Sequence, residues 1–197
     1  MARVAAEDRR KLLVDAAIRV MARDGVPRAT TRSIVGEADM ALAAFHYCFR
    51  SKAELLERVA EEILARTLSP ALEIVTGEGT VEERVRSGVA SYWRHVVEHP
   101  DEHRLTYEIT QYAGRTEGLE VLARHQYRAY VDAHRSLLEA LIEHDGLTLA
   151  RPAEDVARYL AAVVDGITLL YLNEGDAAAA EAALDVAVDH VLVLLGC

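Results

Sequence analysis

Apolar residues recur at intervals of three and four positions along almost the whole chain, and this spacing constrains the fold more than any other feature. The interval matches one face of an amphipathic helix, whereas a half-buried strand would alternate every second residue. Only four prolines and eleven glycines interrupt the 197 residues, so long helices fit between the breaks. The sequence therefore predicts an all-α protein of about nine helices.

Capping residues and helix breakers set the expected helix boundaries. Gly25 should end the first helix, and Thr31 should cap a second helix that runs to about residue 38. Ser51 and Glu54 have the spacing of a capping box at the start of the fourth helix. The other helices are expected over about residues 41–49, 52–68, 81–98, 100–114, 117–143, 156–172 and 177–195.

The charges are distributed unevenly. The chain carries a net charge of −10, which by itself argues against a nucleic-acid partner. Residues 1–52, however, hold ten Lys or Arg against six Asp or Glu, while residues 53–197 hold twelve against twenty-six. A basic head on an acidic body is typical of a protein that brings one end to DNA. We therefore expect a DNA-binding domain over 1–52 and a second domain over 53–197.

Residues 30–49 have the layout of a helix-turn-helix. Ile34 and Val35 should face inward from one short helix, Met40 should fill the turn, and Phe45 and Phe49 should anchor the next helix. Two helices braced in this way expose the second one, and a major groove accepts one helix. An αα-hairpin inside a bundle is the alternative reading of the same pattern.

These residues resemble the TetR family of transcriptional regulators. The resemblance spans roughly residues 12–56 and is carried by Ala16-Ala17, Gly25, Thr30-Thr31-Arg32 and the run from Phe45 to Leu55. A weaker match covers Val164-Asp165-Gly166-Ile167, which is similar to a step in the penultimate helix at the family's dimer interface. The resemblance implies a homodimer, a double-stranded palindromic DNA operator and a ligand cavity in the helical body.

Carried onto this sequence, the resemblance predicts the residues that contact DNA. Arg32 can reach a base edge or clamp a phosphate, and Tyr47 and Lys52 match positions that touch the DNA backbone. Asp39 replaces a usual turn glycine and could also cap the next helix, where Ala41 replaces a usual Ser or Thr cap. The first turn of the recognition helix lacks side-chain hydrogen-bond donors, which favours readout by apolar contacts and groove shape. The predicted set is Thr30, Thr31, Arg32, Leu42, Ala43, Ala44, His46, Tyr47 and Lys52.

The body carries two further predictions. Aromatic and polar side chains at helical spacing would suit a small hydrophobic or aromatic effector, although the same residues could simply fill a core. This set is Trp93, Tyr107, Tyr112, Gln126, Tyr130, His134, Thr168 and Tyr171. The last two helices are too apolar for a fully solvated surface, so we expect them to form the dimer interface, the alternative being burial within the monomer. Its predicted members are Gly166, Leu170, Val191 and Leu195.

Other functional classes receive less support. The sequence shows no nucleophile–base motif, no Glu-x-x-His pair and no glycine-rich phosphate loop, so we expect no enzyme and no cofactor. His95 and His99 are four residues apart, but Pro100 interrupts the spacing before His103, so a metal site is not expected. Two cysteines and no secretory or membrane-spanning segment place the protein in the cytoplasm. The alternatives to a ligand-responsive repressor are a helical-bundle enzyme and a DNA-binding protein that senses no ligand.

Overall fold

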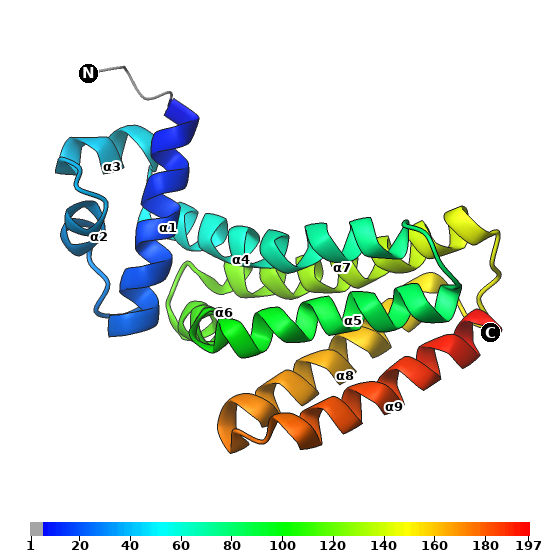
Figure 1. Ribbon diagram of the computed structural model, residues 1–197. Coiled ribbons are helices and arrows are strands. Elements are labelled where there is room, and N and C mark those ends of the chain that lie inside the picture. Colours follow the sequence, from blue (N-terminus) through cyan, green and yellow to red (C-terminus); the bar gives the residue numbers. More distant parts are fainter. Residues whose placement is uncertain (1–5) are drawn as a thin grey trace. The chain divides into compact units, whose positions relative to one another are not determined.

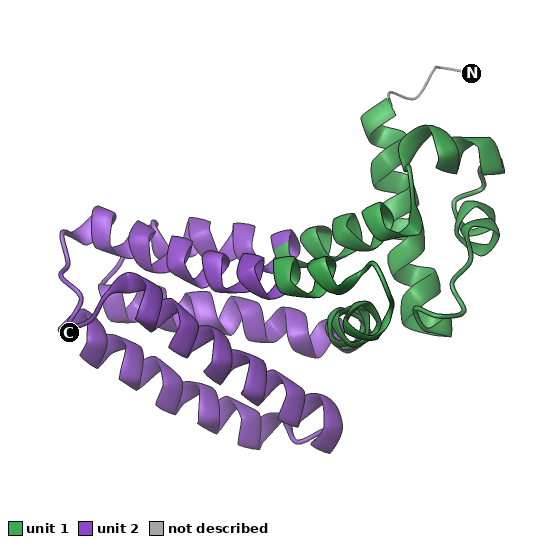
Figure 2. Cartoon of the chain, turned by 180° about the vertical axis from the view of Figure 1, so that it is seen from behind, with its two compact units in different colours: residues 1–64, 101–126 green, residues 65–100, 127–197 purple. Residues whose placement is uncertain are grey.

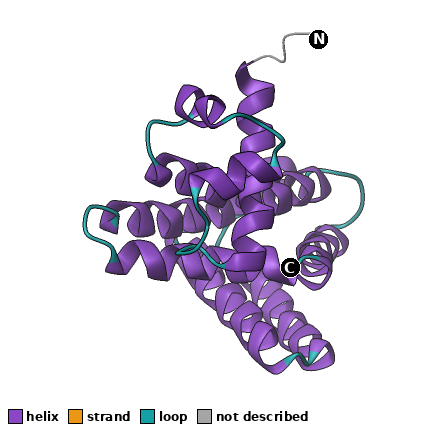
Figure 3. Ribbon diagram, turned by 90° about the vertical axis from the view of Figure 1, so that its left-hand side faces the viewer, coloured by secondary structure: helices purple, strands orange, loops and turns teal. Residues whose placement is uncertain are grey.

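The computed structural model describes residues 6–197, and every regular element in that range is a helix, as the apolar spacing predicts (Figures 1 and 3). No helix in this range is long and apolar enough to cross a membrane. The helices are α1 (Ala6–Asp24), α2 (Thr31–Glu37), α3 (Leu42–Cys48), α4 (Lys52–Val75), α5 (Val81–Glu98), α6 (Pro100–Arg115), α7 (Glu120–Asp145), α8 (Ala153–Glu174) and α9 (Ala177–Leu195).

The chain forms two compact units (Figure 2). Unit 1 comprises residues up to 64 together with residues 101–126, and unit 2 comprises residues 65–100 and 127–197. The helices α4 and α7 each contribute to both units, and almost all of α6 groups with α1, α2 and α3. The functional boundary that the sequence predicts between residues 52 and 53 stays a prediction.

Unit 1 has a single core in which the helix-turn-helix is held against α1 and α6. Ile34, Phe45 and Phe49 are buried there, as predicted, together with Leu13 of α1 and Ile109 of α6. The apolar faces of α2 and α3 are too short to form a stable pair in isolation, because helices of this length are marginal in water. Packing against the longer helices therefore fixes their positions.

The fourth helix is longer than the sequence predicts. The proline at position 70 was expected to follow the helix, but α4 continues through Pro70 to Val75. A proline inside a helix removes one backbone hydrogen bond and costs about 3 kcal/mol. Ala71 and Val75 beyond it are both buried, so tertiary packing of this last segment offsets the local penalty.

Unit 2 is a helical bundle with a buried arginine at one end. The Arg84 guanidinium donates hydrogen bonds to the carbonyl oxygens of Val75 and Gly79 and forms an ion pair with Asp145. These three acceptors compensate the cost of burying the charge. The ion pair lowers the pKa of the Asp145 carboxyl, chiefly through its hydrogen bond from Arg84. Arg84 thereby ties the loop between α4 and α5 to the C-terminal end of α7.

Candidate DNA interface and effector site

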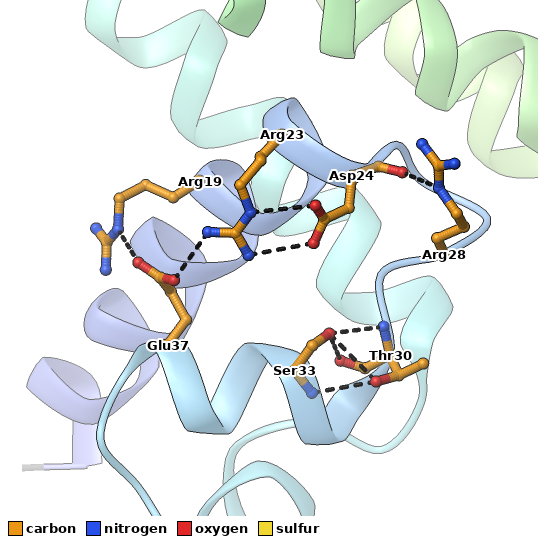
Figure 4. A network of polar contacts seen from close by, with 7 residues as sticks. All are labelled: Arg19, Arg23, Asp24, Arg28, Thr30, Ser33 and Glu37. Carbon is orange, nitrogen blue, oxygen red and sulfur yellow. Dashed lines mark hydrogen bonds and ion pairs between the residues drawn. The ribbon is translucent and has the colours of Figure 1, made fainter.

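The start of α2 is fixed by a reciprocal cap. The Ser33 N–H donates to Thr30 Oγ1 at 3.1 Å, and the Thr30 N–H donates to Ser33 Oγ at 3.0 Å (Figure 4). The capping residue is therefore Thr30, and the prediction that Thr31 caps this helix was wrong because Thr31 is already its first helical residue. Both threonines nevertheless lie at the helix start, where backbone N–H groups favour an anion.

An ion-pair network joins α2 to α1. Arg19 and Arg23 donate to opposite oxygens of the Glu37 carboxylate at 2.9 and 3.3 Å, and Arg23 also pairs with Asp24 (Figure 4). Hydrogen bonds, first from Arg19 and then from Arg23, lower the pKa of Glu37. Arg19 and Arg23 thus have carboxylate partners within the head.

The turn between α2 and α3 uses a left-handed aspartate. Asp39 has φ of +53°, as expected for the residue that replaces a turn glycine. The expectation that Asp39 could also cap α3 was wrong, because the N-cap position is Ala41 and no side chain supplies a cap hydrogen bond there. The first N–H groups of α3 therefore lack a side-chain acceptor.

The α3 helix buries one side and exposes the other. Phe45 and Cys48 are buried, whereas Tyr47 is 67% exposed. Arg32 of α2 is also exposed. Of the remaining residues predicted to contact DNA, Thr30, Leu42, Ala43 and His46 are exposed, and Thr31 and Ala44 are half-buried. The helix therefore presents a mainly apolar surface with a tyrosine and a histidine toward its C-terminal end.

Lys52 differs from the other predicted DNA contacts. Its Nζ donates a 2.8 Å hydrogen bond to the Val26 carbonyl and lies 5.5 Å from the centre of the Tyr112 ring. Glu108 of α6 accepts a 2.9 Å hydrogen bond from the N–H of the same Val26. Partial burial lowers the pKa of Lys52. The N–H and the carbonyl of Val26 are thus each hydrogen-bonded to a side chain of another helix. The Lys52 ammonium is therefore engaged within unit 1.

Arg10 and Glu108 were not identified from the sequence, and Glu54 was identified only as a capping residue. Arg10 donates to the Cys48 carbonyl at 3.0 Å and to Glu54 Oε1 at 2.6 Å. Glu54 Oε2 accepts from the Arg50 N–H at 2.8 Å, so the predicted capping box is half formed: Ser51 Oγ accepts from the Glu54 N–H, but Glu54 does not return to Ser51. The partners of Arg10 lie 38 and 44 residues away, a separation that helical periodicity does not reveal.

The residues predicted to bind an effector fall in both units. Tyr107, Tyr112 and Gln126 belong to unit 1, and the other five belong to unit 2. Gln126 Nε2 donates to the Thr106 carbonyl at 2.9 Å, and Tyr112 lies beside Lys52. Gln126 and Tyr112 are therefore engaged by residues of unit 1.

A cluster of tyrosines, one histidine and one aspartate lies within unit 2. The Tyr92 and Thr168 hydroxyls are 2.7 Å apart, and the Tyr127 hydroxyl donates to Asp165 Oδ2 at 3.2 Å. Ring centres are 4.7 Å apart for Tyr130 and His134. We call Tyr92, Tyr127, Tyr130, His134, Asp165 and Thr168 the tyrosine–aspartate cluster.

Burial shifts the pKa of several members of this cluster, although Tyr127 itself is 45% exposed. Burial raises the pKa of Tyr92 to about 12 and lowers the pKa of His134. The pKa of Tyr127 is raised, first by burial and then by the Asp165 charge. At neutral pH Tyr92 and Tyr127 are therefore protonated hydroxyl donors, and the lowered pKa of His134 favours its neutral form. Beside them, Trp93 and Tyr171 pack edge to face with ring centres 4.8 Å apart.

The helices α8 and α9 expose an apolar face. Leu170 is 58% and Val193 is 70% exposed, and Gly166 is also exposed. By contrast, Val191 and Leu195 are buried in the core of unit 2, although the sequence prediction places both in the dimer interface. A side chain buried in its own chain offers little area to a partner, so the place of these two residues in a dimer interface stays a prediction. The outward apolar residues are Tyr159, Leu169, Leu170, Val186 and Val193.

Comparisons with known proteins cover both parts of the chain. A model of the tetR family of bacterial regulatory proteins matches residues 13–59, and a model of the C-terminal domain of BetI-type transcriptional repressors matches residues 81–196. The nicotine-responsive transcriptional repressor HdnoR of Paenarthrobacter nicotinovorans is 34% identical over 172 residues, covering 87% of this chain and 88% of that protein.

Less similar proteins also match over most of their length. The transcriptional regulator BetI of Rhizobium meliloti (strain 1021) is 27% identical over 183 residues, covering 93% of this chain and 87% of that protein. Among solved structures, a TetR-family regulator from Rhodococcus sp. has a TM-score of 0.76 at 16% identity and covers 96% of this chain and 99% of its own. The last similarity shows a shared fold.

Proposed function

This chain belongs to the TetR family of bacterial regulatory proteins, and from this membership we propose that it binds a palindromic operator as a homodimer and is released by a small, mainly hydrophobic or aromatic effector. It is a transcriptional repressor of the TetR/BetI type and not an enzyme. Since operator DNA lies in the bacterial cytoplasm, we place the protein there.

One observation carries the proposal for DNA. The recognition helix α3 is braced by the buried Phe45 and Phe49 and leaves Leu42, His46 and Tyr47 exposed. A helix held in this way can enter a major groove, where apolar side chains contact thymine methyl groups. Arg32 and the α2 start would contact the adjoining backbone or a base edge.

We place the effector site at the tyrosine–aspartate cluster and the neighbouring Trp93 and Tyr171. Aromatic rings with a few hydroxyls suit a small aromatic molecule, and the carboxylate of Asp165 further favours one that carries a positive charge. HdnoR, to which this chain is similar, responds to nicotine, an aromatic molecule with a basic amine. Tyr107, Tyr112 and Gln126 remain predictions of the sequence alone.

The homodimer would use the exposed face of α8 and α9. Several exposed apolar side chains on one pair of helices are a common mark of an interface, and the exposed Gly166 would allow two helices to approach closely. In a two-fold dimer the two recognition helices must lie about 34 Å apart to enter successive major grooves. The continuous helix α4, which contributes to both units, is the proposed lever that links the effector to this spacing.

The DNA proposal can be tested by selection. Purified protein should enrich an inverted repeat from a randomised duplex library, with half-sites about one helical turn or a multiple of it apart. Leu42→Asp should abolish binding, whereas Val97→Asp, at another exposed apolar position on α5, should not. Failure to enrich any duplex would remove the proposed function.

The effector proposal needs a separate test with nicotine as the probe. Release of the selected duplex should require Asp165 if a cation is recognised, so Asp165→Asn should lose release. The matched control is Asp155→Asn, which changes an exposed aspartate of the same helix. If neither nicotine nor uncharged aromatic compounds release the wild-type protein, the alternative of a DNA-binding protein that senses no ligand is favoured.

A further inference from the structure

Two consecutive arginines near the start of α1 have different surroundings. Arg10 is engaged by three residues: it donates to the Cys48 carbonyl and to Glu54, and its guanidinium carbon lies 4.7 Å from the centre of the Phe49 ring. These contacts attach α1 to the end of α3 and to the start of α4. Arg10 is therefore part of the framework of the head.

Arg9 instead lies against the exposed residue of the recognition helix. Its guanidinium carbon is 5.1 Å from the centre of the Tyr47 ring. The Nε atom is covered and has no hydrogen-bond partner, and within residues 6–197 the structure gives Arg9 no ion pair or hydrogen bond. Among these residues the tyrosine ring is thus the contact that orients this cation.

Most neighbouring cations are already engaged. Arg19 and Arg23 pair with Glu37, Arg10 pairs with Glu54, and Lys52 donates to Val26. For each of these, a phosphate would have to compete with a carboxylate or carbonyl partner, which costs binding free energy. Arg9 carries no such cost, because stacking on a ring leaves the donors at the edge of the guanidinium plane available.

We propose that Arg9 and Tyr47 together form a clamp for one phosphate of the DNA backbone beside α3. The inference rests on the proposed DNA interface and assigns α1 a direct contact there. A guanidinium offers two parallel N–H donors that match phosphate oxygens, and the tyrosine hydroxyl offers a third donor. Stacking on the ring holds the guanidinium in place before DNA arrives, so less side-chain entropy is lost on binding.

The test measures binding to the selected duplex over a range of salt concentrations. Arg9→Ala should weaken binding about tenfold and reduce the salt dependence by about one counterion per protomer. The matched control is Lys11→Ala, which removes the same charge from an exposed position about 200° around the same helix. Lys11→Ala should leave both quantities near those of the wild type.

Three further variants separate the clamp from a general charge effect. Arg9→Lys keeps the charge but loses the planar fork, so it should keep the salt dependence and still bind several-fold more weakly. Tyr47→Phe keeps the ring and loses the hydroxyl, so binding should weaken with an unchanged salt dependence. The double variant Arg9→Ala, Tyr47→Phe should lose less than the sum of the single effects, because both residues hold one phosphate.

Several outcomes would overturn the clamp. Wild-type affinity and salt dependence in Arg9→Ala would remove Arg9 from the interface while leaving the proposed function intact, provided that Leu42→Asp still abolishes binding. Strict additivity in the double variant would show that the two residues act separately. Thermal unfolding of each variant guards against a folding defect, and Arg9→Lys preserves the test if Arg9→Ala does not fold.

Discussion

At the scale of single residues, position and partner decide what a charged side chain does. Lys52 matches a position that the sequence assigns to the DNA backbone, yet its ammonium is held by the Val26 carbonyl and the Tyr112 ring. Arg9 has neither carboxylate nor carbonyl partner within the described residues and lies on Tyr47. Two cations of one head can thus differ in function although both sit near the helix-turn-helix.

We expect Lys52→Ala to affect folding more than DNA binding. Loss of a hydrogen bond from a charged donor to a partly enclosed carbonyl should lower the free energy of unfolding by about 1 kcal/mol. The salt dependence of DNA binding should not change, since the lysine is engaged within unit 1. Urea unfolding of this variant tests the loss of stability, and its DNA binding at several salt concentrations tests the salt dependence. Unchanged stability with a salt dependence lower by about one counterion would restore Lys52 to the phosphate contacts.

His134 should make stability depend on pH. Burial lowers its pKa from the usual 6.5, so below pH 6.5 the unfolded chain binds a proton that the folded chain does not. The contribution to stability is therefore present above pH 6.5 and is lost as the pH falls from there toward the folded pKa, at no more than about 1.4 kcal/mol per pH unit. Unfolding of wild type and His134→Gln at several pH values measures the difference. Parallel curves for the two proteins would contradict this prediction.

At the scale of helices, the ends of α2 and α3 differ in how they are satisfied. Reciprocal hydrogen bonds between Thr30 and Ser33 close the start of α2, while α3 begins at Ala41 without a side-chain acceptor. Both helices have seven residues, so one cap is a large part of their local stability. The recognition helix therefore depends on the packing of Phe45 and Phe49 more than on its own termini.

The cap assignment gives a matched pair of variants. Thr30→Ala should lower the free energy of unfolding by about 1 kcal/mol, the usual loss for an N-cap threonine. Thr31→Ala should change it little, because Thr31 is the first helical residue and supplies no cap. Urea unfolding of both variants gives the comparison. Equal losses would mean that the two threonines share the cap.

At the scale of the whole molecule, the chain passes between its two units at three places. The junctions fall within α4, directly after Pro100 at the start of α6, and within α7. Glu108 of α6 accepts a hydrogen bond from Val26 in the loop that precedes α2. A shift of α6 would therefore act directly on this loop of the head. An effector that binds one conformation better shifts the population toward it, and DNA must then weaken effector binding by the same factor.

The proposed dimer can be tested at an exposed position of α8. Leu170→Arg places a charge on a side chain that is 58% exposed, so the fold of the monomer should tolerate it while an apolar interface should not. Light scattering should show the mass of a dimer for the wild type and of a monomer for the variant. Val121→Arg, an equally drastic change at an exposed position of α7, should remain dimeric. A dimeric Leu170→Arg variant would place the interface elsewhere.

The sequence alone determined the class of fold and the buried side of the helix-turn-helix. Apolar spacing predicts all-α structure, and the order Ile34, Val35, Phe45, Phe49 predicts which side of the helix-turn-helix is buried. Gly25 and Asp39 adopt the left-handed conformations that their positions indicate. These features could be predicted because they arise from residues that are close in the chain.

Tertiary structure decided the features that depend on distant partners. The helix α4 continues through Pro70 because buried packing beyond it outweighs a local penalty. Val191 and Leu195 are buried in their own chain, while Leu170 and Val193 face outward, a difference that an evenly apolar helix does not reveal by composition. Arg9 and Arg10 are adjacent in sequence, but the residues that they contact lie 38 or more positions away. Those contacts make Arg10 a structural residue and leave Arg9 as a candidate phosphate contact. Helical periodicity reports which face is apolar, whereas the partner of a polar group is set by where the other helices lie.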